Sequence, residues 1–117
     1  MKKVYYLSTC DTCKRIMKEL GVDQTFDKQD IKTEKITPEQ LEQMKELAGS
    51  YESLFSRVAR KYKSLGLKEK ALTEEDYKKY ILEEYTFLKR PVFIIDNEIF
   101  IGNSKKNVQA LLTKLES

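Results

Sequence analysis

The sequence predicts an α/β fold in which a mixed four-stranded sheet is flanked by helices. Three observations support this prediction. The first thirty residues read as strand, helix and strand, the middle of the chain keeps a helical period, and two apolar runs near the C-terminus are joined by a short turn. A chain of 117 residues is long enough for one core without disulfides or metals. We therefore expect residues 1–117 to form a single domain with a helical insert over about 38–87.

The N-terminal elements form a βαβ unit. Residues 3–7, Lys-Val-Tyr-Tyr-Leu, are β-branched and aromatic, which favours a buried strand. From Asp11 the apolar spacing becomes helical, and Gly21 is the type of residue that commonly ends a helix. Residues 25–31 predict a second, weaker strand. The two strands should be parallel, with a right-handed crossover.

The insert carries its own start and stop signals. Thr37, Pro38 and Gln40 are typical of a helix N-terminus, so a helix should run to about residue 48 and end at Gly49. Residues 54–65 keep a helical period up to Gly66, through Leu54, Phe55, Val58, Tyr62 and Leu65. A further helix should open at Thr73, with an apolar side of Tyr77, Tyr80, Ile81 and Tyr85.

The C-terminal segment predicts a hairpin and a helix. Residues 91–95, Pro-Val-Phe-Ile-Ile, are strand-like, and Asp96-Asn97 turns the chain into a strand over 98–101. Ser104 can cap a last helix that packs back on the sheet. This order of elements is the thioredoxin-like plan.

The number and spacing of the cysteines limit the kinds of site that the chain can form. The chain has two cysteines, Cys10 and Cys13, and no histidine. Structural zinc sites and most iron–sulfur clusters need four such ligands, so we expect no bound metal or cofactor within one chain. Three interpretations of the two cysteines remain: redox chemistry, a metal site shared between molecules, or two inert cysteines. The motif follows the first strand, where a thioredoxin-like fold has its chemistry, which favours redox use.

The thiols of Cys10 and Cys13 should differ in acidity. Cys10 lies at a helix N-terminus, where unpaired N–H groups and the helix dipole favour a thiolate, whereas Cys13 lies one turn inside the helix. We therefore expect Cys10 to be the nucleophile and Cys13 the resolving thiol. The carboxylate of Asp11 partly opposes the thiolate, and the sequence leaves this balance open.

Arginines provide candidate anion-binding groups. Pro91 at the entry of an apolar strand suggests a cis bond in a tight turn. In thioredoxin-like folds, which this order of elements resembles, such a proline faces the cysteine motif, and this would bring Arg90 close to the cysteines. A surface arginine before a strand-edge proline is the alternative. Arg57 and Arg60, three apart on one predicted helix, are further candidates, and either could instead lie on a solvated face.

Charge and hydropathy exclude some classes of function. The net charge is +3, from 22 basic and 19 acidic residues, which does not favour nucleic acid or an anionic membrane as a partner. The N-terminus lacks the apolar stretch of a signal peptide, and no segment approaches the roughly 20 apolar residues of a spanning helix. We expect a cytoplasmic monomer.

With these motifs in place, the chain resembles the arsenate reductase (ArsC) family, which also includes the Spx-type transcriptional regulators. The resemblance covers essentially the whole chain. It rests on Tyr-Leu-Ser-Thr-Cys-Asp-Thr-Cys-Lys-Arg at 6–15, Leu-Phe-Ser-Arg at 54–57, Tyr-Lys-Ser-Leu-Gly-Leu at 62–67, Leu-Lys-Arg-Pro at 88–91 and Ile-Gly-Asn at 101–103.

The resemblance implies a thiol-dependent reductase of arsenate or a related oxyanion or disulfide. Cys10 would attack the substrate, Arg57 and Arg90 would hold it, and glutathione with glutaredoxin, or thioredoxin, would be the reductant. Two departures point to an alternative. Glutathione-dependent members have serine where this chain has Cys13, and they carry a third arginine that residues 102–104 lack. Both features resemble the Spx-type branch, whose members use the cysteine pair as a redox switch and bind RNA polymerase.

Overall fold

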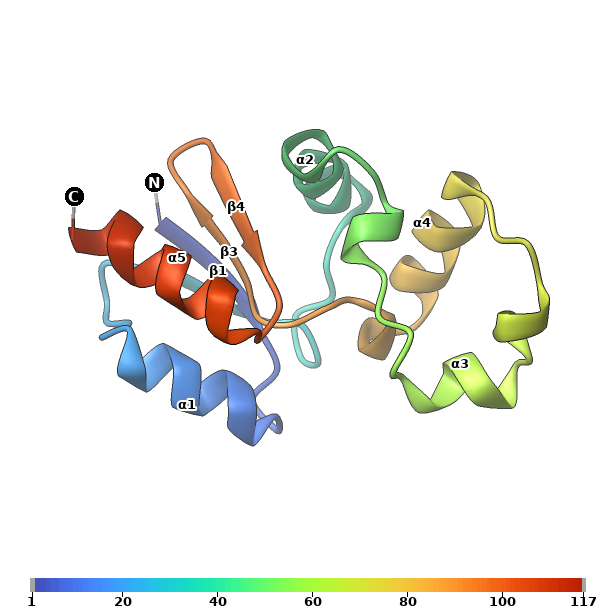
Figure 1. Ribbon diagram of the computed structural model, residues 1–117, viewed down its shortest axis with the longest axis horizontal. Coiled ribbons are helices and arrows are strands. Elements are labelled where there is room, and N and C mark those ends of the chain that lie inside the picture. The colour runs from blue at the N-terminus through green and yellow to red at the C-terminus, as the bar shows by residue number, and fades with distance from the viewer. Residues whose placement is uncertain (1, 117) are drawn as a thin grey trace. The chain divides into compact units, whose positions relative to one another are not determined.

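The computed structural model describes residues 2–116, and the chain divides into two compact units. The sheet unit comprises the residues up to 35 together with those from 90 onward. The helical unit comprises residues 36–89. Figure 1 shows the elements of both units along the chain.

The sheet unit contains four strands in the order β2-β1-β3-β4. β1 pairs in parallel with β2, whereas the β1–β3 and β3–β4 pairs are antiparallel, so the sheet is mixed, as the sequence predicts. Its elements are β1 (Lys2–Tyr6), α1 (Asp11–Glu19), β2 (Asp27–Asp30), β3 (Val92–Ile95), β4 (Glu98–Ile101) and α5 (Lys105–Glu116).

β2 begins two residues later than the sequence predicts. The Asp23 carboxylate accepts hydrogen bonds from the Thr25 backbone N–H (2.9 Å) and hydroxyl (2.6 Å). These bonds fold residues 23–25 into a local turn, which competes with strand pairing. Phe26 is buried just before the strand starts.

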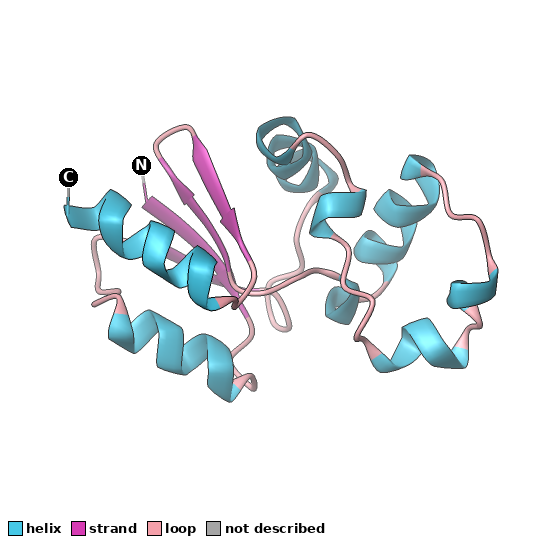
Figure 2. Cartoon of the chain, viewed as in Figure 1, coloured by secondary structure: helices cyan, strands magenta, loops and turns pink. Residues whose placement is uncertain are grey.

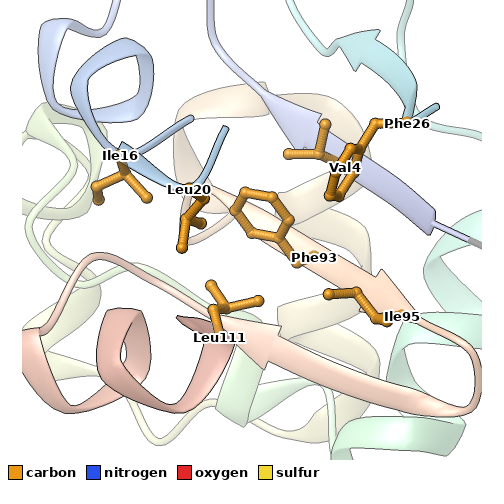
Figure 3. Packing of buried hydrophobic residues seen from close by; sticks show 7 residues of the cluster. All are labelled: Val4, Ile16, Leu20, Phe26, Phe93, Ile95 and Leu111. Carbon is orange, nitrogen blue, oxygen red and sulfur yellow. The ribbon is translucent and has the colours of Figure 1, made fainter. Parts of the chain in front are cut away.

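α1 and α5 pack on the same face of the sheet. Figure 3 shows the ring of Phe93 between Leu20, the C-cap residue of α1, and Leu111 of α5, and Val4, the partner of Phe93 in the β1–β3 register, belongs to the same cluster. The ring of Phe26 meets the ring of Phe93 edge-on at 6.1 Å. The complete buried cluster consists of Val4, Ile16, Leu20, Phe26, Phe93, Ile95 and Leu111.

The C-terminal hairpin and helix form where the turn and capping residues of the sequence predict them. Asp96 has φ 57°, a left-handed conformation that matches the twist of a tight hairpin turn. The Ser104 hydroxyl accepts the Asn107 N–H over 3.1 Å and thereby caps α5. At the other end of α5, Lys114 pairs with Glu98 of β4 at 3.0 Å.

The helical unit contains three α-helices and three short 3₁₀ turns among the residues described (Figure 2). α2 begins with the predicted capping box of Thr37 and Gln40 and ends at Gly49, whose φ is 96°. Thr73 caps α4 in the same way, through Asp76. The elements are α2 (Pro38–Ala48), η1 (Glu52–Leu54), α3 (Arg60–Ser64), η2 (Leu67–Glu69), α4 (Glu74–Glu83) and η3 (Tyr85–Phe87).

The helix that the period predicts over 54–65 is wrong for residues 54–59, whereas residues 60–64 form α3. Phe55 forms an isolated antiparallel bridge with Leu88, and the Ser56 N–H donates to the Phe87 carbonyl over 2.7 Å. Because these backbone groups pair across the chain, they are not available for helical bonds. The residue that the pattern placed on the apolar face, Val58, is 92% exposed. Likewise Tyr85 belongs to η3 and not to α4, which ends at Glu83.

Candidate thiol site

The loop between β1 and α1 holds Cys10 at the start of the helix. The Cys10 N–H donates to the Leu7 carbonyl over 2.9 Å, which closes a turn after β1. Cys10 is the N-cap of α1 with extended backbone angles (φ −96°, ψ 108°), and its carbonyl accepts the Lys14 N–H over 3.2 Å. This is the position at which orphan helix N–H groups meet an N-cap side chain.

Cys13 lies beneath Cys10 in the first turn of α1. Its backbone N–H donates to Cys10 Sγ over 3.4 Å, so the sulfur takes the place of the usual capping oxygen. The Cys13 side chain is completely buried, whereas Cys10 is partly exposed. Both are free thiols in this structure. The prediction that the two residues lie together at the helix start is confirmed.

The Cys10 thiol is acidified. Its partial burial is the largest single influence on its pKa and raises it. Hydrogen bonds from the Cys13 backbone and side chain, together with the charge of Arg90 and a hydrogen bond from it, outweigh burial and bring the pKa below its ordinary value. Each of these donors favours the thiolate over the thiol. The Asp11 side chain is fully exposed beside Lys14, at 3.7 Å.

The pKa of the Cys13 thiol is shifted in the opposite direction. Burial raises the pKa of its thiol to about 12, and the hydrogen bond that it makes to Cys10 adds to this effect. Of the two thiols, Cys10 is therefore the one that loses its proton first as the pH rises. This asymmetry is the one expected for a nucleophile and a resolving thiol.

Arg90 and Pro91 adjoin the cysteines from the entry of β3. The Arg90–Pro91 bond is cis, as the sequence predicts. Arg90 acts on the Cys10 thiolate through its charge and a hydrogen bond. Pro91 is buried, and its carbonyl accepts the Gly102 N–H over 2.9 Å, which ties the start of β3 to the end of β4.

The other two predicted arginines belong to the helical unit and do not share a helix. Arg57 lies in the turn before α3, whereas Arg60 is the first residue of that five-residue helix. The expectation of neighbouring positions on one helical face is therefore wrong, because the backbone bonds of Ser56 to Phe87 break the helix there. Arg57 pairs with Glu52 at 2.8 Å, while Arg60 is exposed.

Sequence reasoning missed Asp30. Its carboxylate accepts the backbone N–H of Ser8 over 3.3 Å and that of Lys32 over 3.2 Å. It thus fastens the loop that leads to Cys10 onto the end of β2. An acidic residue at the carboxyl end of a strand parallel to β1 was the available signal, because the carboxyl ends of parallel strands meet at one edge.

Across residues 2–116, no group of three or more histidine, cysteine, aspartate or glutamate side chains is arranged to hold a metal ion. No helix in that range has the length and apolar character that a membrane crossing requires.

Comparisons with known proteins agree with the fold. The model of the ArsC family matches residues 5–111. An arsenate reductase (ArsC) related protein from Brucella melitensis superposes with a TM-score of 0.71 at 21% identity, over 93% of this chain and 92% of that chain. An arsenate reductase from Vibrio cholerae superposes with a TM-score of 0.76 at 14% identity, over 96% and 95%.

A third solved structure, the YffB (PA3664) protein, superposes with a TM-score of 0.77 at 24% identity, over 96% of this chain and 99% of that chain. At these identities the likeness shows the shared fold. No curated protein matches the chain significantly in sequence.

Proposed function

Because the chain belongs to the ArsC family, we propose that it is a thiol-dependent oxidoreductase with Cys10 as nucleophile and Cys13 as resolving thiol. Its substrate would be arsenate, a related oxyanion or a disulfide. Glutathione with glutaredoxin, or thioredoxin, would be the reductant. We further propose that it works as a single-domain monomer in the cytoplasm, where such reductants keep cysteines reduced.

The opposite pKa shifts of the two thiols carry this proposal. The lowered pKa of Cys10 makes its thiolate more available for attack than that of an ordinary thiol, and the Cys13 thiol, whose pKa is raised, lies one helical turn away as an internal second thiol. Two inert structural cysteines would need neither the N-cap position nor an arginine beside one sulfur. This arrangement favours catalysis or redox switching over packing.

With arsenate, the reaction would proceed in balanced steps. The Cys10 thiolate forms a sulfur–arsenic bond while an arsenate oxygen takes up two protons and leaves as water. Cys13, losing its proton, then attacks the Cys10 sulfur, and a disulfide forms as the sulfur–arsenic bond breaks. The electron pair of that bond stays on arsenic, which leaves as arsenite. The external thiol then reduces the disulfide with two electrons and two protons.

Anion binding would rest on the arginines. Arg90 already favours negative charge at Cys10, which supports a role in binding and transition-state stabilisation. The family resemblance supports Arg57 as a second anion ligand, with Arg60 as the other candidate. The buried Pro91 would complete the wall of the site.

One observation favours a second function, a redox-sensing regulator of the Spx type that binds RNA polymerase. Residues 102–104, where the resemblance implies a third arginine, contain no basic residue. Gly102 turns the chain there with φ 91°, and its carbonyl accepts the Asn107 side-chain amide over 2.8 Å. The loop is organised to start α5, and it offers no cation to an oxyanion.

An arsenate reduction assay tests the choice, with the glutaredoxin and thioredoxin systems compared side by side. We expect slow turnover that Cys10→Ser abolishes, because no other residue supplies a nucleophilic thiolate. Arsenate-independent reduction of the oxidised protein by thioredoxin measures the disulfide step separately. Absence of turnover with every donor, together with redox-dependent binding of purified RNA polymerase, would replace the enzyme with the regulator.

A further inference from the structure

The turn that precedes α1 contacts both thiols of the site. Residues 7–10 form this turn, which is closed by the hydrogen bond from the Cys10 N–H to the Leu7 carbonyl. The Leu7 backbone also reaches the sulfur of Cys13, where burial raises the pKa of the thiol and the hydrogen bond from Leu7 opposes that rise. Ser8 and Thr9 form the corner between these contacts. The conformation of the turn therefore determines where Cys10 lies relative to Cys13.

Asp30 joins the corner of this turn to the neighbouring strand. Its Oδ1 atom accepts the backbone N–H of Ser8 over 3.3 Å. The next residue, Ile31, donates its N–H to the Tyr6 carbonyl over 2.9 Å and so extends the contact between β1 and β2 beyond the last ladder pair. The end of β2 is therefore bonded to the chain both before and within the turn.

The Asp30 carboxylate is itself held by the loop that follows β2. Its Oδ1 atom also accepts the Lys32 N–H over 3.2 Å, and the Asp30 carbonyl accepts the Glu34 N–H over 2.8 Å. The side-chain amide of Gln29, a residue that is only 1% exposed, donates to the Glu34 carbonyl over 3.0 Å. The carboxylate cannot turn away from Ser8 without losing its bond to Lys32.

The carboxyl group of Asp30 is ionised at neutral pH. Partial burial raises its pKa, but hydrogen bonds from Ser8 and Lys32 outweigh burial and bring the pKa below its ordinary value. An ionised carboxylate only accepts hydrogen bonds, and those from backbone N–H groups to a charged acceptor are stronger than neutral ones. Asp30 is thus a fixed acceptor for the turn.

We propose that Asp30 is a positioning residue, which holds the turn of residues 7–10 so that the Cys10 sulfur stays within reach of the Cys13 N–H. This inference rests on the proposed role of Cys10 as nucleophile and adds to it what keeps the nucleophile in place. The negative charge of Asp30 by itself disfavours a nearby thiolate. Support of the Cys10 thiolate through the turn has the opposite sign, so substitutions at position 30 separate the two effects.

Iodoacetamide alkylation of Cys10, followed against pH by peptide mapping, tests the proposal. In Asp30→Ala the turn loses its acceptor, so the profile should move to higher pH, and the rate below the plateau should fall about 2- to 5-fold. Asp30→Asn keeps a side-chain oxygen for the Ser8 N–H and removes the charge. Its profile should stay at that of the wild type or move to lower pH.

Two further variants complete the test. Asp27→Ala is the matched control, because Asp27 lies at the other end of β2, where its carboxylate pairs with Lys3 at 3.0 Å, and it should leave the profile unchanged. Asp30→Glu keeps the charge and displaces the acceptor, so its profile should move to higher pH. This variant decides the test if circular dichroism shows that Asp30→Ala does not fold.

Three results would overturn the positioning role. The Cys10 profile of Asp30→Ala, or of Asp30→Glu where that variant decides, could stay unchanged. It could instead move to lower pH, which would leave only the effect of the charge. An upward shift of equal size in Asp30→Asn would also contradict the proposal, because an acceptor is still present in that variant.

The positioning role and the proposed function can fail separately. A Cys10 profile that does not depend on position 30, in a protein that reduces arsenate, would remove the positioning role and leave the enzyme intact. A profile that depends on Asp30 in a protein without turnover would support the positioning role and remove the arsenate reductase function.

Discussion

The backbone N–H of Cys13 donates to the sulfur of Cys10 over 3.4 Å, so the Cys10 side chain caps α1 through its sulfur. Thiolate stabilisation and helix capping are therefore the same interaction. Because that bond depends on a charged or strongly polar sulfur at Cys10, changes in its oxidation state act directly on the first turn of α1.

The two thiols should differ in their rate of alkylation because their pKa values differ. Alkylation by iodoacetamide requires the thiolate, whose fraction rises as pH passes the pKa. Because the pKa of Cys10 is lowered, its alkylation rate should reach a plateau below the pH expected for an ordinary thiol. Cys13, with a pKa raised to about 12, should stay unmodified in the folded protein at pH 8. Peptide mapping by mass spectrometry measures both rates, and earlier labelling of Cys13 would reverse the assignment.

Mild oxidation should produce one intramolecular disulfide between Cys10 and Cys13. The residues share one helical turn, and they are the only cysteines of the chain. Thiol counting by mass spectrometry should find two free thiols in the reduced protein and none in the oxidised monomer, and thioredoxin should restore both. Oxidised protein that retains both thiols, or that is cross-linked only between molecules, would contradict a redox switch.

Arg90→Ala should raise the pKa of Cys10, because the substitution removes both a positive charge and a hydrogen bond from the thiolate. Arsenate turnover should fall strongly for the same reason. The pH profile of iodoacetamide alkylation should move to higher pH. Asp11→Asn is the control, since the Asp11 side chain is fully exposed, and it should move the profile less. An unchanged profile in Arg90→Ala would separate Arg90 from the thiol.

Leu111→Ala should destabilise the protein by about 2–5 kcal/mol, because it leaves a cavity where α5 packs on the sheet. Leu111 is completely buried among Phe93, Ile95 and residues of α1. Urea denaturation followed by circular dichroism gives the free energy of unfolding. Leu65→Ala removes the same atoms from a side chain that is 46% exposed, and its cost should be clearly smaller. Equal costs would mean that the core is packed differently from this description.

Elements with local signals could be predicted from the sequence. The capping box at Thr37, the glycine at position 49 and the turn at Asp96 each depend on residues that are neighbours in the chain. The period over 54–65 was misleading because its apolar residues serve different contacts. Phe55 stacks on Phe87 at 5.0 Å, whereas Val58 faces solvent. Spacing alone does not distinguish these two environments.

The candidate site also contains features that could be predicted from the sequence and features that could not. Cys10, Cys13 and the cis bond before Pro91 were predictable, because each occupies a recognisable position at the start of a helix or strand. The contact of Asp30 with Ser8 and the hydrogen bond from Arg57 to Tyr77 were not predictable. Asp30 acts on Ser8 from 22 positions away, and Tyr77 acts on Arg57 from 20 positions away.

By itself, the sequence determined the α/β class, the cysteine pair and its place after the first strand, because these depend on local patterns and on residue types. The sequence also predicted Cys10 as the more acidic thiol, whereas the tertiary structure alone decided which groups set the two pKa values. That decision depends on how deeply each sulfur is buried and on which donors reach it, and the burial of Cys13 and the approach of Arg90 arise only when β3 pairs with β1.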